Sequence, residues 1–189
     1  MKFLKKNYGW LIVSALATLP FIPLAKMALE NGAGSIDMLY HISGEFAIRW
    51  MTAVLTLTPV FILFGVTNLF VRQAMGIATA VWSLLHFVIF IIAEGFAETF
   101  TQFNYVLGFI AVLILIPLLF TSNRKAMQRL KTNWKKLQSF AYLAILLSLA
   151  HVAILEKTWI IYAVIVGLGF IIRIPEVKTS ILKYRQQKK

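Results

Sequence analysis

The stretch that decides the fold is residues 74–97, which read AMGIATAVWSLLHFVIFIIAEGFA. Its only ionisable side chains are His86 and Glu94. A run of about 20 apolar residues is the length that crosses a bilayer as a helix, so this stretch predicts a membrane span. The rest of the chain agrees, because 60% of its 189 residues are apolar and its mean hydropathy is +0.80, whereas soluble domains are roughly 45–50% apolar.

Further apolar stretches lie on either side of this one. The six predicted spans are 8–29, 44–67, 74–97, 104–120, 138–155 and 158–175. They are expected to be helices, because an open chain in lipid has no other way to satisfy its backbone. The connections are too short for a soluble domain, and no internal repeat is visible. The predicted fold is therefore all-α: a polytopic six-transmembrane-helix bundle that forms a single domain over residues 1–189.

The first span also resembles a signal peptide, but its apolar run is longer than the 7–15 residues of a signal core, so we predict a span. Pro20, Pro23, Pro59 and Pro117 lie inside the predicted spans, and each removes a backbone donor. At Pro59 the hydroxyl of the preceding residue, Thr58, is expected to re-satisfy the freed carbonyl.

Successive connections between predicted spans lie on alternate sides of the membrane. When the charged residues are assigned to these two sides, most basic residues fall on one side and most acidic residues on the other. One side carries 16 of the 19 basic residues and a single acid, Glu176. The other carries six acids, including Glu156, and only Lys26, Arg49 and Lys157 as basic residues. Because cytoplasmic loops are rich in Lys and Arg, both termini are predicted to be cytoplasmic.

The same rule accounts for the net charge of +12 without a nucleic-acid partner. The connection 121–137 holds six basic residues, which we interpret as topological and facing membrane lipid. Docking of an acidic cytosolic reductase domain is the alternative.

Two histidines lie inside spans that both run outward from the cytoplasm. His86 follows Arg72 by 14 residues, and His151 follows Lys136 by 15 residues. At ~1.5 Å per residue both rings lie roughly 21–22 Å from the inner boundary. Two imidazoles at one depth on different helices are what a bis-histidine heme requires. Each could instead be a core residue bonded to a neighbouring carbonyl. The chain has no cysteine, which excludes thiolate ligands.

Three other residues are candidates for the same site. His41 lies at the outer mouth of the second span, where an interfacial histidine needs no special role. Arg49 could pair with heme propionates, snorkel outward, or be neutralised by Glu45 at i−4. Trp82, one turn before His86, could pack on a macrocycle edge or fill the bundle.

Several segments together resemble a known family. They are HISGEFAIRW (41–50), Thr58-Pro59, Arg72 and Gly76 leading to WSLLHF (82–87), and TSNRKAMQRLKTNWKKLQSFAYL (121–143) followed by Ala150-His151. Their order and spacing resemble the MsrQ (formerly YedZ) family, the heme-binding membrane subunits of bacterial periplasmic methionine sulfoxide reductase systems. This family lies within the ferric-reductase-like group that includes NADPH oxidases. The resemblance covers about residues 36–155.

The resemblance implies a six-helix cytochrome b of the bacterial inner membrane. It would pass electrons from the quinone pool or a cytosolic flavin reductase to a periplasmic molybdenum-cofactor subunit. In the family the residues matching His86 and His151 bind heme b, and the position of Arg49 is basic. FMN or quinone is a further expected carrier.

The sequence departs from the family pattern at three positions. Gln138 stands where the family has a further histidine, Leu130-Lys131 replaces a Leu-Gly, and Glu45 occupies a usually basic position. Because glutamine is a poor heme ligand beside imidazole, the inner half of the bundle is expected to lack a second heme.

Three function hypotheses remain from the sequence. The first is an electron-transfer subunit with heme and no catalytic residue of its own. The second is a small non-heme transporter or membrane assembly protein whose histidines are structural. The third is a quinol-reactive heme enzyme with an inner cavity near Arg72, Gln138 and Trp134. No paired carboxylates, Ser/His/Asp arrangement or Gly-rich phosphate loop in the sequence supports an enzyme acting on a soluble substrate.

Overall fold

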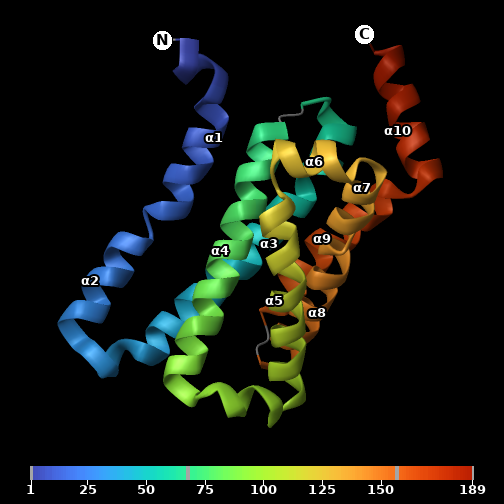
Figure 1. Cartoon of the computed structure of the whole chain (residues 1–189). Helices are drawn as coiled ribbons and strands as arrows, with labels where there is room; N and C mark the ends of the chain where they lie inside the picture. The colour runs from blue at the N-terminus through green and yellow to red at the C-terminus, as the bar shows by residue number, and fades with distance from the viewer. Residues whose placement is uncertain (1, 67–68, 156–157, 189) are drawn as a thin grey trace.

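The computed structural model describes residues 2–66, 69–155 and 158–188, which form ten α-helices, two short 3-10 helices and no strand (Figure 1). In chain order the elements are α1 (Lys2–Thr18), α2 (Phe21–Asn31), η1 (Gly32–Ser35), α3 (Ile36–Phe64), α4 (Leu69–Glu94), η2 (Phe96–Phe100), α5 (Phe103–Thr121), α6 (Arg124–Leu130), α7 (Thr132–Ser139), α8 (Ala141–Leu155), α9 (Trp159–Arg173) and α10 (Pro175–Gln187). The all-α class predicted from hydropathy is confirmed.

Five helical segments are long and apolar enough to cross a membrane. They are Tyr8–Asn31, Ile36–Phe64, Phe70–Glu94, Phe103–Thr121 and Thr132–Leu155. The sixth expected span, 158–175, corresponds to α9 alone, and the chain bends by 76° into α10 at Pro175. It is a span only when α9 and α10 are taken together, because α9 by itself has 15 residues, about 22 Å of helix against a hydrocarbon core of about 30 Å.

The helix boundaries differ from the predicted spans at several points. The second span begins at Ile36 rather than 44, because α3 continues as a helix through the polar residues that precede its apolar run. Residue 67, the predicted end of that span, lies outside the described residues. The first span is broken between Thr18 and Phe21, next to Pro20, so that α1 and α2 are separate helices.

The basic connection 121–137 is largely helical. It contains α6 and most of α7, which meet at Lys131. Lys131 has φ 49° and ψ −121°, and it is the only non-glycine residue in the described part of the chain with positive φ. This conformation favours glycine, the residue that the resembling family has at this position.

The connections at the two ends of the bundle differ in charge. The beginning of α1, the end of α10 and the basic helices α6 and α7 all lie at one end, and η2 lies at the opposite end (Figure 1). Glu94 and Glu98 therefore lie far from the basic helices. Glu156, Lys157 and Lys189 fall outside the described residues. The two ends of the chain thus reach the same side of the bundle.

The helices pack in two main pairs, α3 along α4 and α5 along α8, with α9 against α3. Ala144 and Ile145 of α8 are fully buried in the cluster that joins these elements. Large apolar side chains remain exposed on the outer surfaces, among them Ile161 and Leu168 of α9. A continuous apolar exterior of this kind suits contact with lipid.

Pro59 lies inside α3 and leaves the carbonyl of Leu55, four residues earlier, without its helical donor. The predicted substitute donor was Thr58. Instead, Arg173 at the end of α9 donates from Nη2 to the Leu55 oxygen, and from Nη1 to Gly169 at 2.8 Å. The carbonyl that Pro59 leaves without a helical donor is therefore satisfied by a neighbouring helix.

Candidate cofactor site

A cavity lies between α3, α4, α5 and α8, toward the end of the bundle that carries η2. Its volume is about 120 Å³, and it is partly open to the outside. Its walls are mostly apolar and aromatic, including Ile48, Met51, Phe87, Phe109 and Val112. Both intramembrane histidines line it.

His86 comes from α4 and is fixed by α3. Its Nδ1 lies 3.1 Å from the carbonyl oxygen of Tyr40 and 3.2 Å from the hydroxyl of Ser43. The Tyr40 ring stacks on the imidazole with centroids 4.6 Å apart and planes 22° apart. Because a carbonyl can only accept, Nδ1 carries the proton, and the lone pair of the neutral ring is on Nε2.

His151 comes from α8 and is fixed in the same way by α5. Its Nδ1 lies 2.7 Å from the carbonyl oxygen of Asn104, so Nδ1 is again the donor and Nε2 holds the lone pair. A second partner on Nδ1 is the usual way in which a ligating histidine is oriented. Both rings are thus presented in the tautomer that can bind a metal through Nε2.

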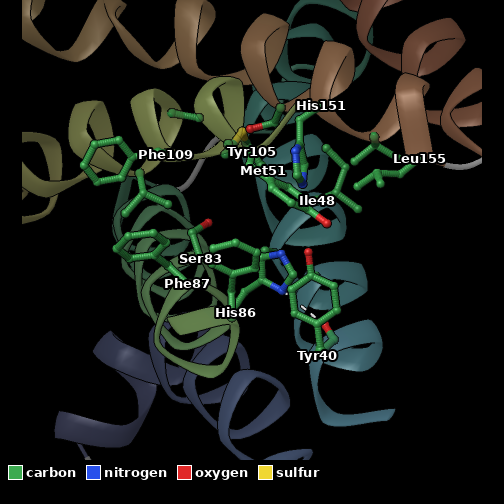
Figure 2. Close-up of a pocket in the computed structure, with 18 of the residues that line it drawn as sticks. Tyr40, Ile48, Met51, Ser83, His86, Phe87, Tyr105, Phe109, His151 and Leu155 are labelled. Carbon is green, nitrogen blue, oxygen red and sulfur yellow. Dashed lines mark hydrogen bonds between the residues drawn. The ribbon is translucent and has the colours of Figure 1, made fainter. Parts of the chain in front are cut away.

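The two rings face each other across the cavity (Figure 2). Their centroids are 6.5 Å apart and their planes make an angle of 68°. Metal–imidazole bonds are about 2.0–2.1 Å long, so a separation of this size leaves room for one metal between the two rings. The observed separation fits ligation of one metal from opposite sides.

The described residues contain no group of three or more His, Asp or Glu side chains that could hold a metal ion. A metal between His86 and His151 would take its further ligands from groups other than these side chains. An iron porphyrin supplies four, and an apolar aromatic cavity suits its faces. The residues present fit such a group.

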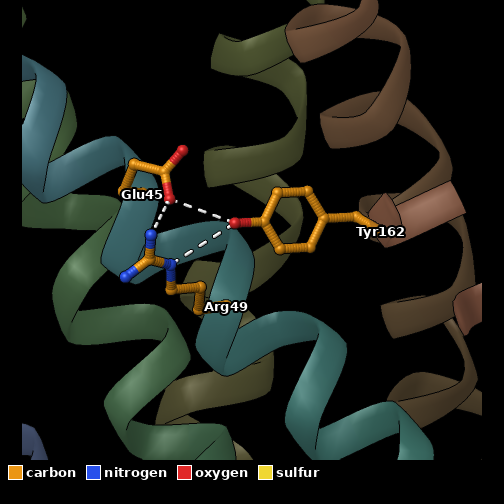
Figure 3. Close-up of polar contacts among 3 residues, drawn as sticks. All are labelled: Glu45, Arg49 and Tyr162. Carbon is orange, nitrogen blue, oxygen red and sulfur yellow. Dashed lines mark hydrogen bonds and ion pairs between the residues drawn. The ribbon is translucent and has the colours of Figure 1, made fainter. Parts of the chain in front are cut away.

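Arg49 lies at the edge of the site and already has partners. It forms an ion pair with Glu45 and approaches the hydroxyl of Tyr162 with Nε at 3.4 Å. That hydroxyl donates to the Glu45 carboxylate at 3.0 Å (Figure 3). Glu45 lines the cavity, while the Arg49 side chain is 59% exposed. Of the three roles considered for Arg49, the structure shows the pairing with Glu45.

Trp82 lies outside the cavity, whereas His41 lines it. Trp82 is fully buried between Phe21 and Phe46, with ring centroids 4.4 Å and 4.6 Å away, and its N–H donates to Ala17 at the break between α1 and α2. It faces the N-terminal helices and does not line the cavity. His41 is exposed within α3 and does line it.

Gln138 and Trp134, expected beside an inner cavity, are bound to the end of α5. Gln138 donates to the Leu118 carbonyl at 3.3 Å and to the Thr121 hydroxyl at 3.1 Å. The Trp134 N–H donates to the Thr121 carbonyl at 2.8 Å. Their polar atoms fasten α7 to α5.

Sequence reasoning missed the residues that orient the histidines, Tyr40, Ser43 and Asn104. Two of them act through the backbone carbonyl, which every residue has, so residue type carries no signal for that role. Glycines inside apolar helices, such as Gly44 and Gly108, are a weak signal of close packing by another group.

The fold and the site define a class: a multi-pass helical membrane protein in which two helices present a histidine pair to an apolar cavity. The chain belongs to the ferric reductase like transmembrane component family, which it matches over residues 43–149. That range contains His86 and most of the cavity wall, and His151 lies two residues beyond its end.

Curated relatives carry a more specific name. The chain is similar to the protein-methionine-sulfoxide reductase heme-binding subunit MsrQ of Brucella ovis, Brucella canis and Brucella suis. Each is 28% identical over 149 residues, covering 73% of this chain and 68% of the relative. No solved structure matches the chain.

Proposed function

We propose that this protein is a membrane electron-transfer subunit that binds heme b between His86 and His151. The observation that carries the proposal is the histidine pair, 6.5 Å apart across an apolar cavity, with each Nδ1 bound to a backbone carbonyl. The relatives named as heme-binding subunits support it. When bound, heme supplies a one-electron couple at its iron.

The chain's own residues would hold the heme and set its midpoint potential. The Tyr40 and Asn104 carbonyls fix the ring orientations and raise the basicity of the ligands. Apolar walls exclude water, which favours the less charged state of the site. The Glu45–Arg49 ion pair and Tyr162 lie at one edge of the cavity or beside it, where the pair places charged side chains near the site.

The proposed electron path runs across the bacterial inner membrane, with the basic end of the bundle in the cytoplasm. Quinone or a cytosolic flavin reductase would donate, and a periplasmic oxidoreductase such as a methionine sulfoxide reductase would accept. The names of the relatives support a methionine sulfoxide reductase as the acceptor. The position of the histidine pair, toward the less basic end of the bundle, supports an acceptor on that side.

The test is a reduced-minus-oxidised spectrum of the purified protein and three alanine variants. Wild type and His41→Ala are expected to show the same low-spin b-type bands. His86→Ala and His151→Ala are each expected to lose the heme or convert it to a high-spin form, because one of the two histidines that would hold it is gone. His41 is the matched control, since it lines the same cavity from outside the pair.

Two results would contradict the proposal. A colourless wild type, expressed with adequate heme supply, would favour the transporter or assembly hypothesis with structural histidines. Wild-type heme content and line shape in both His86→Ala and His151→Ala would place the heme elsewhere.

A further inference from the structure

Two glycines lie directly against the two histidines. A Cβ added to Gly44 would come within 3.0 Å of Cε1 and 3.2 Å of Nδ1 of His86. A Cβ added to Gly108 would come within 3.2 Å of the same two atoms of His151. Each imidazole therefore occupies the space that a side chain on the neighbouring helix would take.

Helix geometry explains why these positions lack a side chain. In an α-helix the carbonyl of residue n accepts from the N–H of residue n+4. Gly44 is four residues after Tyr40, and Gly108 is four residues after Asn104. Each glycine thus lies beside the carbonyl that the histidine binds. The histidine reaches that oxygen by passing over the glycine. At Tyr40 the Ser43 hydroxyl also donates to the same oxygen, at 2.9 Å.

The site is consequently built from two copies of one unit, although no sequence repeat is visible. In each copy a helix contributes a carbonyl and a glycine, and the helix that packs most closely along it contributes the histidine. The first copy is Tyr40, Gly44 and His86 of α3 and α4, and the second is Asn104, Gly108 and His151 of α5 and α8.

We propose that Gly44 and Gly108 are positioning residues: each lets one imidazole lie on a helix backbone, so that Nδ1–H binds the carbonyl and Nε2 faces the cavity. The part of this inference that concerns heme rests on the function proposed above. The part that concerns imidazole orientation does not.

The test variants are Gly44→Ala and Gly108→Ala, with Gly76→Ala and Gly167→Ala as controls. At Gly76 and Gly167 an added Cβ would meet no described atom within 4 Å. Gly76 is in α4, the helix that carries His86. All four changes add one methyl group to a helix and raise helix propensity equally, so differences between the two pairs report the contact with imidazole.

The first measurement needs no heme. The chain has three histidines, so ¹⁵N-histidine labelling gives three sets of ring signals. In wild type, the rings of His86 and His151 are expected to show a protonated Nδ1 and an unprotonated Nε2. Gly44→Ala should shift the signals of His86, Gly108→Ala those of His151, and neither should shift those of His41.

The second measurement uses heme-loaded protein that elutes as a single species in detergent. A displaced ring weakens the Nδ1 hydrogen bond and makes the ligand less basic, which disfavours ferric iron. Gly44→Ala and Gly108→Ala are therefore expected to raise the midpoint potential and alter the ferric electron paramagnetic resonance spectrum. The two control variants should match wild type in both.

Defined results would overturn the proposal. One is a wild-type spectrum in which the two rings lack the Nδ1–H tautomer, which is measurable even if a glycine variant fails to fold. Another is that the Gly44→Ala and Gly108→Ala variants both fold and show the ring signals and midpoint potential of the control variants. A heme-free wild type would refute the proposed function while leaving the ring-signal test in force.

Discussion

Arg173 on α9 donates a hydrogen bond to the carbonyl oxygen of Leu55 on α3. Pro59 cannot supply the helical N–H that this oxygen would otherwise accept. The guanidinium also lies over the Tyr142 ring, 5.5 Å from its centroid. One side chain thus replaces a missing backbone donor and joins α9 to two other helices.

A double-mutant cycle tests this compensation. Arg173→Met should lower the free energy of unfolding by about 1–3 kcal/mol, because it leaves a partly buried carbonyl without a donor. In a Pro59→Ala background the N–H at 59 is restored, so the same change should cost less. The contacts of Arg173 with Gly169 and Tyr142 are lost in both backgrounds and cancel. Equal costs in the two backgrounds, measured by denaturant unfolding in detergent, would show that Leu55 needs no outside donor.

The 68° angle between the imidazole planes predicts the electron paramagnetic resonance spectrum of the oxidised protein. Near-perpendicular axial ligands leave the two iron orbitals that they overlap almost equal in energy, which gives a highly anisotropic low-spin signal with one dominant low-field feature. Nearly parallel rings would separate those orbitals and give a resolved rhombic spectrum. A rhombic spectrum from frozen wild-type protein would contradict the ring geometry.

One heme per chain is expected, because Gln138 binds the end of α5 where the resembling family has a further histidine. The pyridine hemochrome of purified protein, set against protein concentration, measures this ratio. Gln138→Leu should leave the ratio unchanged and reduce stability by about 0.5–1.5 kcal/mol for each hydrogen bond lost. A ratio of two hemes per chain, or loss of heme in Gln138→Leu, would contradict the expectation that the inner half of the bundle holds no heme.

Arg49→Leu is expected to lower the heme potential through Glu45, which lines the cavity and would lose its cation. An unneutralised carboxylate near the iron favours the ferric state. The shift should be on the order of 10–40 mV, because exposed ion pairs are worth about 0.2–1 kcal/mol and 59 mV corresponds to about 1.4 kcal/mol for one electron.

A second substitution separates this explanation from direct pairing of Arg49 with a propionate. In Arg49→Leu/Glu45→Gln the carboxylate is gone as well, so the potential should return toward wild type. If the potential of the double variant stays as low as that of Arg49→Leu in a redox titration, the guanidinium acts on the heme directly.

Lys131→Gly should stabilise the junction of α6 and α7. The backbone of Lys131 has φ 49°, a conformation that costs a non-glycine residue about 1–3 kcal/mol. Lys135→Gly is the matched control, since it removes the same charge from an exposed site inside α7, where glycine is unfavourable by about 0.5–1 kcal/mol. Amide hydrogen exchange across the two helices should slow in the first variant and quicken in the second. Faster amide exchange in both variants would contradict the expectation that the backbone of Lys131 is strained.

The class of fold and the identity of the central histidines were predictable from the sequence. Hydropathy is a local property, and each apolar run of about 20 residues predicts a membrane helix without knowledge of its neighbours. The rise per residue then placed His86 and His151 at one depth, and the structure brings their rings together. Charge bias placed both ends of the chain on one side, as the bundle shows (Figure 1).

Which side chain meets which neighbour was decided by tertiary structure. Arg49 had three reasonable partners by sequence, and the approach of α9 beside α3 brought Tyr162 to the Glu45 pair. Trp82 lies at the break between α1 and α2, where its N–H donates to the carbonyl of Ala17. These contacts depend on how the helices are rotated against one another and on backbone groups that every residue has. The order of residue types along the chain therefore does not predict them.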